Sequence, residues 1–251
     1  MAKKKKKKAA PRLSPSMFKV TGAHAKVKVD TKKKKMYYFK EVVKPEKAKQ
    51  IALKDAPDIL GASSDAIKMS KPALKYDFYC IYDAEMELKF LRVRKQELGV
   101  NDEVKGVFVG KEVITPKKGK NIPGKAIHLD IIELFELKRS DEMTLDGKTG
   151  GPASAMERML KGAGKRSASA AWLSKAKVSP GKFNSLDKVI KAVSKAAGGR
   201  PSDAKRVVQH TLSFSKLDGF YVPTYYIKVR AGAKSQMIRV NGIDGTLALA
   251  V

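Results

Sequence analysis

The sequence predicts an α+β protein made of two units, each a helix packed on an antiparallel sheet, with a disordered basic arm at the N-terminus. Three observations lead to this prediction. The 251 residues are 43% hydrophobic, which is enough for globular cores in two modest domains. Helical apolar periodicity occurs in residues 45–56 and 186–197, each followed by strand-like segments. Residues 1–17 include six consecutive lysines and bury almost no apolar surface, so we expect disorder there.

Strand signals follow the arm and then the first helix. Residues 18–43 alternate in a way that predicts a β-hairpin with its tip at residues 30–32. After the first helix, strand-like composition recurs in residues 74–82, 85–93 and 104–114.

The first predicted helix spans residues 45–56. Ala48, Ile51 and Ala52 are spaced so that they share one face, which is typical of an amphipathic helix. We expect Pro57 to end this helix, because proline lacks the backbone N–H that a continuing helix needs.

The second half of the chain repeats this order. The β-branched residues within 126–137 predict a strand. Residues 140–153 predict a linker, and residues 154–177 predict a basic helical segment. A helix at residues 186–197 is closed by Gly198 and Gly199. Strands are expected at 206–214, 221–230 and 235–240.

These segments define four regions. They are a disordered basic arm (1–17), a first α+β unit (18–139), a linker with a basic helical segment (140–182) and a second α+β unit (183–251). Leu74, Tyr76, Tyr79 and Ile81 follow the first helix much as Leu217, Tyr221, Tyr225 and Ile227 follow the second, which suggests an internal duplication.

The second unit resembles a PepSY-type module, which is a helix packed on a small antiparallel sheet. The resemblance rests on the helix at 186–197, the stretch 225–241 and the Gly-Ile-Asp-Gly-Thr-Leu segment at 242–247. A fainter resemblance covers residues 45–114. It implies a role as an interaction or inhibitory unit.

Positive charge is concentrated in two blocks of the chain. Of the net +28, residues 1–50 carry +15, residues 51–150 are neutral with 17 basic and 17 acidic residues, and residues 151–251 carry +13. Such a distribution favours polyanionic partners, and above all nucleic acid, because phosphate contacts gain free energy by releasing counterions.

The leading hypothesis is a non-enzymatic, sequence-nonspecific nucleic-acid-binding protein, acting on nucleoid DNA or on ribosomal and other structured RNA. The expected contacts come from the arm, from the second lysine run and from the basic C-terminal region. They are Lys3, Lys4, Lys5, Lys6, Lys7, Lys8, Lys32, Lys33, Lys34, Lys35, Lys165, Arg166, Lys188, Lys191, Lys195, Arg200, Lys205 and Arg206.

The alternative is a PepSY-type protein-interaction module that docks on an acidic protein or an anionic membrane surface. We expect no enzyme activity, metal or cofactor, because the three histidines are far apart and no catalytic or metal-binding motif is present. Neither a secretory signal nor an apolar run of about 18 residues is found. An intracellular location is therefore expected, in the cytoplasm or nucleoid, or in the nucleus of a eukaryote.

Two further motifs allow competing interpretations. Gly147-Lys148-Thr149 is similar to the end of a phosphate-binding loop, but the glycine five residues earlier is absent, so a flexible linker is favoured. Asp83, Glu85 and Glu87 alternate on one strand face, where they could hold a divalent cation. Pairing of this face with Lys228 and Arg230 is the favoured alternative.

Overall fold

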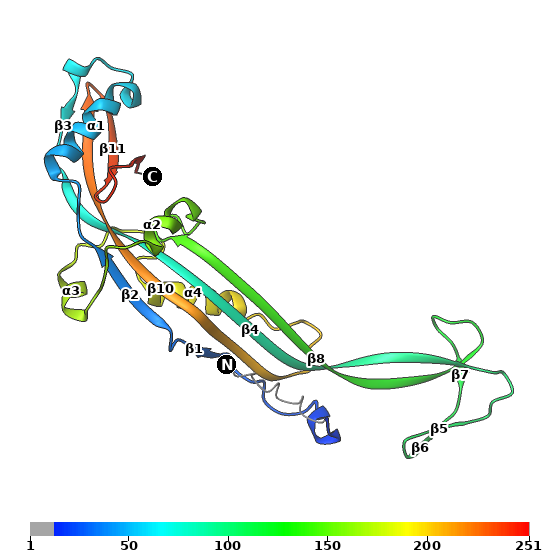
Figure 1. The fold of residues 1–251 in the computed structure, drawn as a ribbon. Helices are drawn as coiled ribbons and strands as arrows, with labels where there is room; N and C mark the ends of the chain where they lie inside the picture. The colour runs from blue at the N-terminus through cyan, green and yellow to red at the C-terminus, as the bar shows by residue number, and fades with distance from the viewer. Residues whose placement is uncertain (1–12, 251) are drawn as a thin grey trace, which may run out of the picture. The chain divides into compact units, whose positions relative to one another are not determined.

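The computed structural model describes residues 13–250 and shows a mixed α+β fold, which confirms the predicted fold class (Figure 1). Residues 1–12 of the predicted arm, with Lys3 to Lys8, lie outside the described residues. The helices are α1 (Pro45–Leu60), α2 (Glu157–Lys161), α3 (Ala170–Lys175) and α4 (Leu186–Ala197), with 3-10 turns η1 (Pro15–Phe18), η2 (Ser64–Ala66) and η3 (Ser154–Met156).

One large mixed sheet contains most of the strands, and β5 and β6 form a separate pair. The main strand order is β12-β11-β10-β4-β8-β7, with β1, β2 and β3 also pairing with β10, and β9 pairing with β2. The strands are β1 (Lys28–Asp30), β2 (Lys34–Phe39), β3 (Lys68–Met69), β4 (Ala73–Val100), β5 (Val107–Val109), β6 (Glu112–Ile114), β7 (Lys117–Lys118), β8 (Lys125–Asp146), β9 (Lys165–Ser167), β10 (Arg206–Ala231), β11 (Lys234–Asn241) and β12 (Leu247–Leu249).

The described chain divides into two compact units, each built from segments that are distant in sequence. Unit 1 contains residues 13–28, 86–139 and 198–211, and unit 2 contains residues 29–85, 140–197 and 212–250. The strands β4, β8 and β10 each contribute residues to both units.

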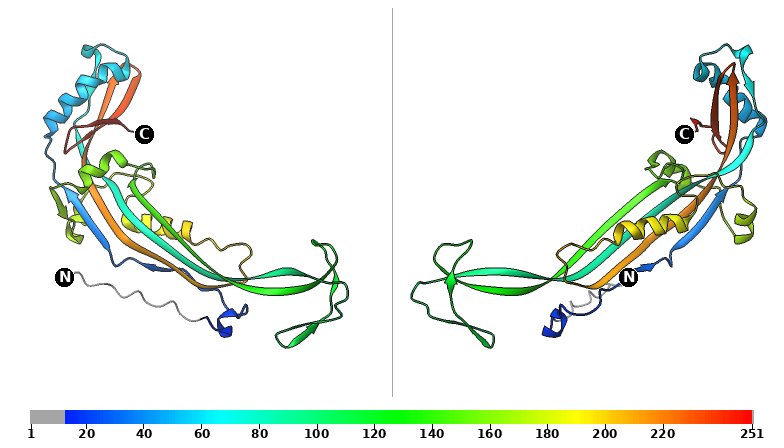
Figure 2. Two further views of the ribbon diagram at one scale, coloured as in Figure 1. Left: turned by 45° about the vertical axis from the view of Figure 1, so that its right-hand side comes forward. Right: turned by 180° about the vertical axis from the view of Figure 1, so that it is seen from behind.

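In unit 2, α1 packs on β10 and β11 (Figure 2). Its alanine face, with Ala48 and Ala52 fully buried, meets Ile227 of β10 and Ile238 and Val240 of β11. The small side chains let the helix approach the sheet closely. Met69 of β3 and Leu74 of β4, which follow α1 in sequence, also pack on this core, and strands from the end of the chain complete it. The structure does not show a duplication.

Pro57 does not end α1, in contrast to the sequence prediction. The helix continues to Leu60 because Ala56 and Leu60, both buried, extend its apolar face past the proline. A proline in the last turn removes a single N–H, and Gly61 then closes the helix in the left-handed conformation (φ 59°).

The predicted hairpin at residues 18–43 is correct in its turn but wrong in its pairing. Lys34 N donates to Thr31 O (3.0 Å) across the turn, yet β1 and β2 both pair with β10 instead of with each other. The β2–β10 ladder is parallel, with Tyr37 opposite Phe220. Local alternation predicts a strand but does not identify a partner that is distant in sequence.

The strands are longer than predicted, because β4 and β10 continue where the sequence suggested breaks. Residues 140–146, which the sequence placed in a linker, are the end of β8. Within the predicted basic helical segment at 154–177 lies a strand, β9, between the short helices α2 and α3. Helix α4 has the predicted bounds of 186–197, and it lies along the sheet in both views of Figure 2.

A buried carboxylate, Asp77 of β4, joins several elements of unit 2. Its oxygens accept hydrogen bonds from Ser179 Oγ (2.5 Å) and the Tyr226 hydroxyl (2.5 Å), and Arg239 Nη1 lies 3.4 Å away. These four residues form the Asp77 cluster. Burial and the bond to Asp77 raise the pKa of Tyr226 to about 12, so its hydroxyl stays protonated and remains a donor.

The Asp77→Ala variant should lower the free energy of unfolding by about 3–5 kcal/mol, because Arg239 would remain buried without its counter-charge. The matched control is Glu41→Ala, which removes an exposed carboxylate and should change stability by about 0.5 kcal/mol or less. Urea unfolding of both variants measures the difference. Equal stabilities would show that the cluster contributes little.

Candidate nucleic-acid interface

Helix α4 presents a ridge of lysines on the surface of unit 2. Lys188, Lys191 and Lys195 are exposed, while Leu186 and Val189 are buried on the opposite face. The spacing of three and four residues places the lysines along one line of the helix. The lysines therefore lie on the solvent-exposed side of α4.

A second group of basic residues lies where β9 pairs with β2. Tyr38 is opposite Arg166 and Phe39 is opposite Lys165, and both basic residues are exposed. Lys165 Nζ lies 5.5 Å from the centre of the Tyr37 ring. Long-range pairing therefore brings two predicted segments, the second lysine run and the Lys165-Arg166 pair, onto adjacent strands.

Few of the predicted basic residues of unit 2 are neutralised by acids. Lys34 Nζ donates to Asp187 Oδ1 (2.6 Å), a contact that joins β2 to the start of α4. Lys32 lies 3.8 Å from Asp30. Within residues 13–250, no ion pair forms with the other predicted cations of this unit: Lys33, Lys35, Lys165, Arg166, Lys188, Lys191 and Lys195.

The aromatic residues near this surface are largely committed to packing. Tyr37 stacks on Phe220 with ring centres 5.4 Å apart, and Tyr38 stacks on Trp172 at 4.3 Å. Tyr225 and Tyr226 are buried. These rings therefore contribute to the core of unit 2.

The remaining predicted basic residues, Arg200, Lys205 and Arg206, belong to unit 1. Arg206 Nη1 donates to the Lys19 carbonyl oxygen (2.9 Å), and Arg200 Nη1 lies 2.7 Å from His24 Nε2. Sequence reasoning missed Lys19 and His24. The only sequence signal for them is that their segment contains lysines. Their contacts are with residues about 180 positions away.

The carboxylates of β4 are held by hydrogen bonds and by lysine. Glu87 is paired with Lys138 of β8 (2.8 Å), and the Ser215 hydroxyl donates to Asp83. Pairing with Lys228 and Arg230 is therefore wrong, because those residues lie on a part of β10 that pairs with β3 and β11. In the part of the chain that the structure describes, no group of His, Cys, Asp and Glu is placed to hold a metal ion.

The turn around Gly147 is tightly packed, not a flexible linker. Its backbone N–H groups are already used: Gly147 N donates to Phe78 O (2.8 Å), Lys148 N to Asp146 Oδ1 (2.7 Å) and Gly150 N to Asp146 O (2.8 Å). A phosphate loop needs these donors free to surround the anion. The turn is therefore a structural element.

Gly147→Ala should destabilise the protein by about 1–3 kcal/mol, because backbone atoms leave no room for the added methyl group. A Cβ at this position would lie 2.2 Å from Phe183 O and 2.4 Å from Phe78 O. Gly199→Ala is the control, since nothing lies within 4 Å of its Cβ position. Thermal unfolding that is the same for both variants would contradict this packing.

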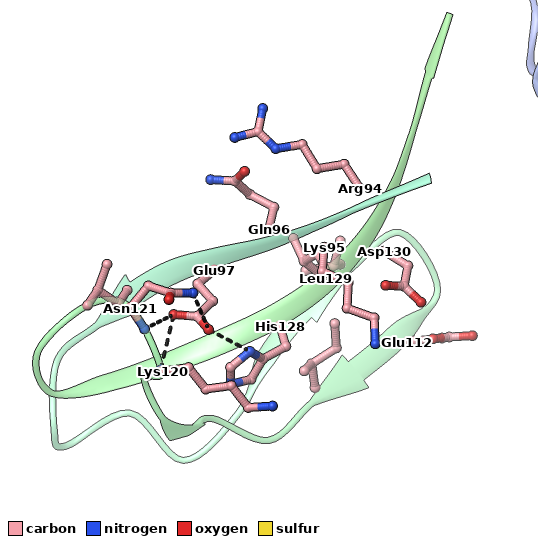
Figure 3. Close-up of a pocket in the computed structure, with 13 residues that line it drawn as sticks. Arg94, Lys95, Gln96, Glu97, Glu112, Lys120, Asn121, His128, Leu129 and Asp130 are labelled. Atoms are coloured by element: carbon pink, nitrogen blue, oxygen red, sulfur yellow. Dashed lines mark hydrogen bonds and ion pairs between the residues drawn. The ribbon is translucent and has the colours of Figure 1, made fainter. Parts of the chain in front are cut away.

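Unit 1 contains a pocket of about 910 Å³ between β4, β8 and the segment that joins them (Figure 3). Glu97 accepts hydrogen bonds from the backbone N–H groups of Lys120 (3.1 Å) and Asn121 (2.9 Å), and His128 Nδ1 lies 3.5 Å from it. The lining balances three Lys and Arg residues against three carboxylates, so it does not select for an anion.

The two backbone hydrogen bonds, with Asn121 first, lower the pKa of Glu97 below its ordinary value of 4.5. A lowered pKa means that this carboxylate stabilises the loop above about pH 4.5 and that the stabilisation is lost as the pH falls through the lower, folded-state pKa. The amide proton shifts of Lys120 and Asn121 should therefore titrate with a midpoint below 4.5. Glu97→Gln should abolish this titration, and a midpoint at or above 4.5 would contradict the assignment.

No family model, curated protein or solved structure matches the chain. None of the helices described in residues 13–250 is both long enough and apolar enough to cross a membrane.

Proposed function

We propose that this protein binds nucleic acid through its phosphates, without sequence specificity and without catalysing a reaction. The observation that carries the proposal is the set of exposed lysines and arginine on α4, β2 and β9 that form no ion pair within the described residues. Phosphate contacts require little geometric precision, because their free energy comes mainly from counterion release.

The dimensions of α4 fit a phosphate backbone. Lys188 and Lys195 are separated by seven residues, which corresponds to roughly 10 Å along the helix axis. This length is the rise of about three nucleotides on one strand of a duplex. The three lysines of the ridge can therefore reach phosphates within a few nucleotides of one strand.

In unit 1, His24 and Arg200 offer a site for one phosphate oxygen. His24 Nδ1 accepts a hydrogen bond from Val207 N (3.1 Å), so the proton of the neutral ring is on Nε2. Arg200 Nη1 lies 2.7 Å from His24 Nε2. An anionic oxygen beside these two nitrogens would accept from the guanidinium group.

The test compares two triple charge reversals. Lys188→Glu/Lys191→Glu/Lys195→Glu should lower the affinity for a DNA or RNA duplex by more than about tenfold and reduce the salt slope by about 0.9 for each lost contact. Lys47→Glu/Lys49→Glu/Lys54→Glu, at exposed positions of α1 beside several acids, should have little effect. Circular dichroism checks folding, and binding is titrated from roughly 50 to 200 mM salt.

Equal losses of duplex affinity from both triple variants would show that binding does not depend on where the positive charge lies. An affinity that is indifferent to salt would contradict phosphate binding. A protein partner that remains bound after nuclease treatment would instead support a PepSY-type interaction module, and competition by anionic vesicles would support a membrane surface.

A further inference from the structure

The ribbon formed by β5 and β6 in unit 1 exposes two large apolar side chains to solvent. Phe108 is 70% exposed and Val113 is 72% exposed. They are directly opposite each other in the antiparallel ladder, so they project from the same face of the ribbon. The two side chains form a small apolar patch on this face.

The opposite face of the ribbon borders the pocket of unit 1. Side chains alternate between the faces of a strand, and Val109, Glu112 and Ile114 line the pocket shown in Figure 3, where Glu112 is labelled. Gly110 makes the turn with a φ of 64°. The Phe108/Val113 face is therefore the side of the ribbon that points away from the pocket.

Exposed lysines flank this ribbon along the chain. Residues 105–120 contain five lysines and a single acid, Glu112. All five lysines are exposed: Lys105, Lys111, Lys117, Lys118 and Lys120. An exposed apolar pair in a segment rich in lysine is complementary to a partner whose interior is apolar and whose surface is anionic. Duplex DNA has this arrangement, with stacked bases inside and phosphates outside.

We propose that Phe108 and Val113 form a wedge that enters duplex DNA between two base pairs from the minor groove, while the surrounding lysines contact the flanking phosphates. Proteins that bend DNA use apolar side chains in this way. The inference rests on the proposed function and extends it from phosphate binding to deformation of the duplex. A platform for single-stranded bases would need several exposed aromatic rings, whereas this ribbon has one aromatic and one aliphatic side chain.

The energetic balance predicts a specific result. Burial of two apolar side chains contributes free energy of the same order as the cost of unstacking one base step. Removal of the wedge should therefore change the affinity only modestly, by less than about tenfold, and abolish the bending. Pyrimidine–purine steps should bend most, since they unstack most easily.

The experiment uses the full chain and a short duplex with a central TA step, labelled with a fluorescent donor and acceptor at its ends. Wild type should increase energy transfer, which corresponds to a bend of about 20–90°. Phe108→Ser/Val113→Ser should bind without this increase, and Phe108→Leu, which keeps an apolar wedge, should retain it. Val42→Ser, at a position 70% exposed on unit 2, is the matched control and should behave as wild type.

The outcomes separate this inference from the proposed function. Binding without bending by wild type, or unchanged bending by the double serine variant, would overturn the wedge and leave phosphate binding intact. Failure of wild type to bind any duplex would overturn both. Recruitment of wild type, but not of the double serine variant, to phosphatidylglycerol vesicles without DNA bending would assign the wedge to a membrane surface instead.

Discussion

The buried charge of Asp77 is the constraint on which unit 2 depends. A carboxylate in a core is stable only when its oxygens are hydrogen-bonded and its charge is balanced, so its partners must be held in place. Those partners come from β10, β11 and the segment just before α4. The main-chain bonds of Tyr76 with Lys177 and Ser179 fasten that last segment beside β4. One ionised group thereby fixes the register of elements that are about 100 to 160 residues apart in sequence.

The basic surface of unit 2 follows from this arrangement. Once the segment at 177–179 is fastened to β4, α4 begins a few residues later, with Leu186 buried beside Gly219 of β10. Burial of this face leaves the lysines of α4 in solvent. Lys34 then reaches Asp187, which places the β2 lysines beside the start of the helix. The Asp77 cluster in the core thus determines which surface of unit 2 carries the basic residues.

The sequence predicts the local features of this protein well and the long-range features poorly. The bounds and the exposed face of α4 follow from periodicity, which a single segment contains in full. The partner of β2 could not be predicted, because parallel pairing with β10 depends on residues about 180 positions away. Gly219 lies in the predicted gap between the strands at 206–214 and 221–230, yet β10 continues through it because neighbouring elements pack there. The Gly147 turn was misjudged for the same reason, since its rigidity comes from Phe78 and Phe183.

Strand β9 has a consequence for the behaviour of the protein in solution. It pairs only with β2 among the described strands, so its outer side presents unpaired backbone groups on which another strand could add. Lys165 and Arg166 place two like charges on this short strand, and a second copy of the chain would bring two more against them. The same cations that attract phosphate therefore oppose self-association through this strand. When an anion neutralises them, this protection against edge-to-edge aggregation weakens.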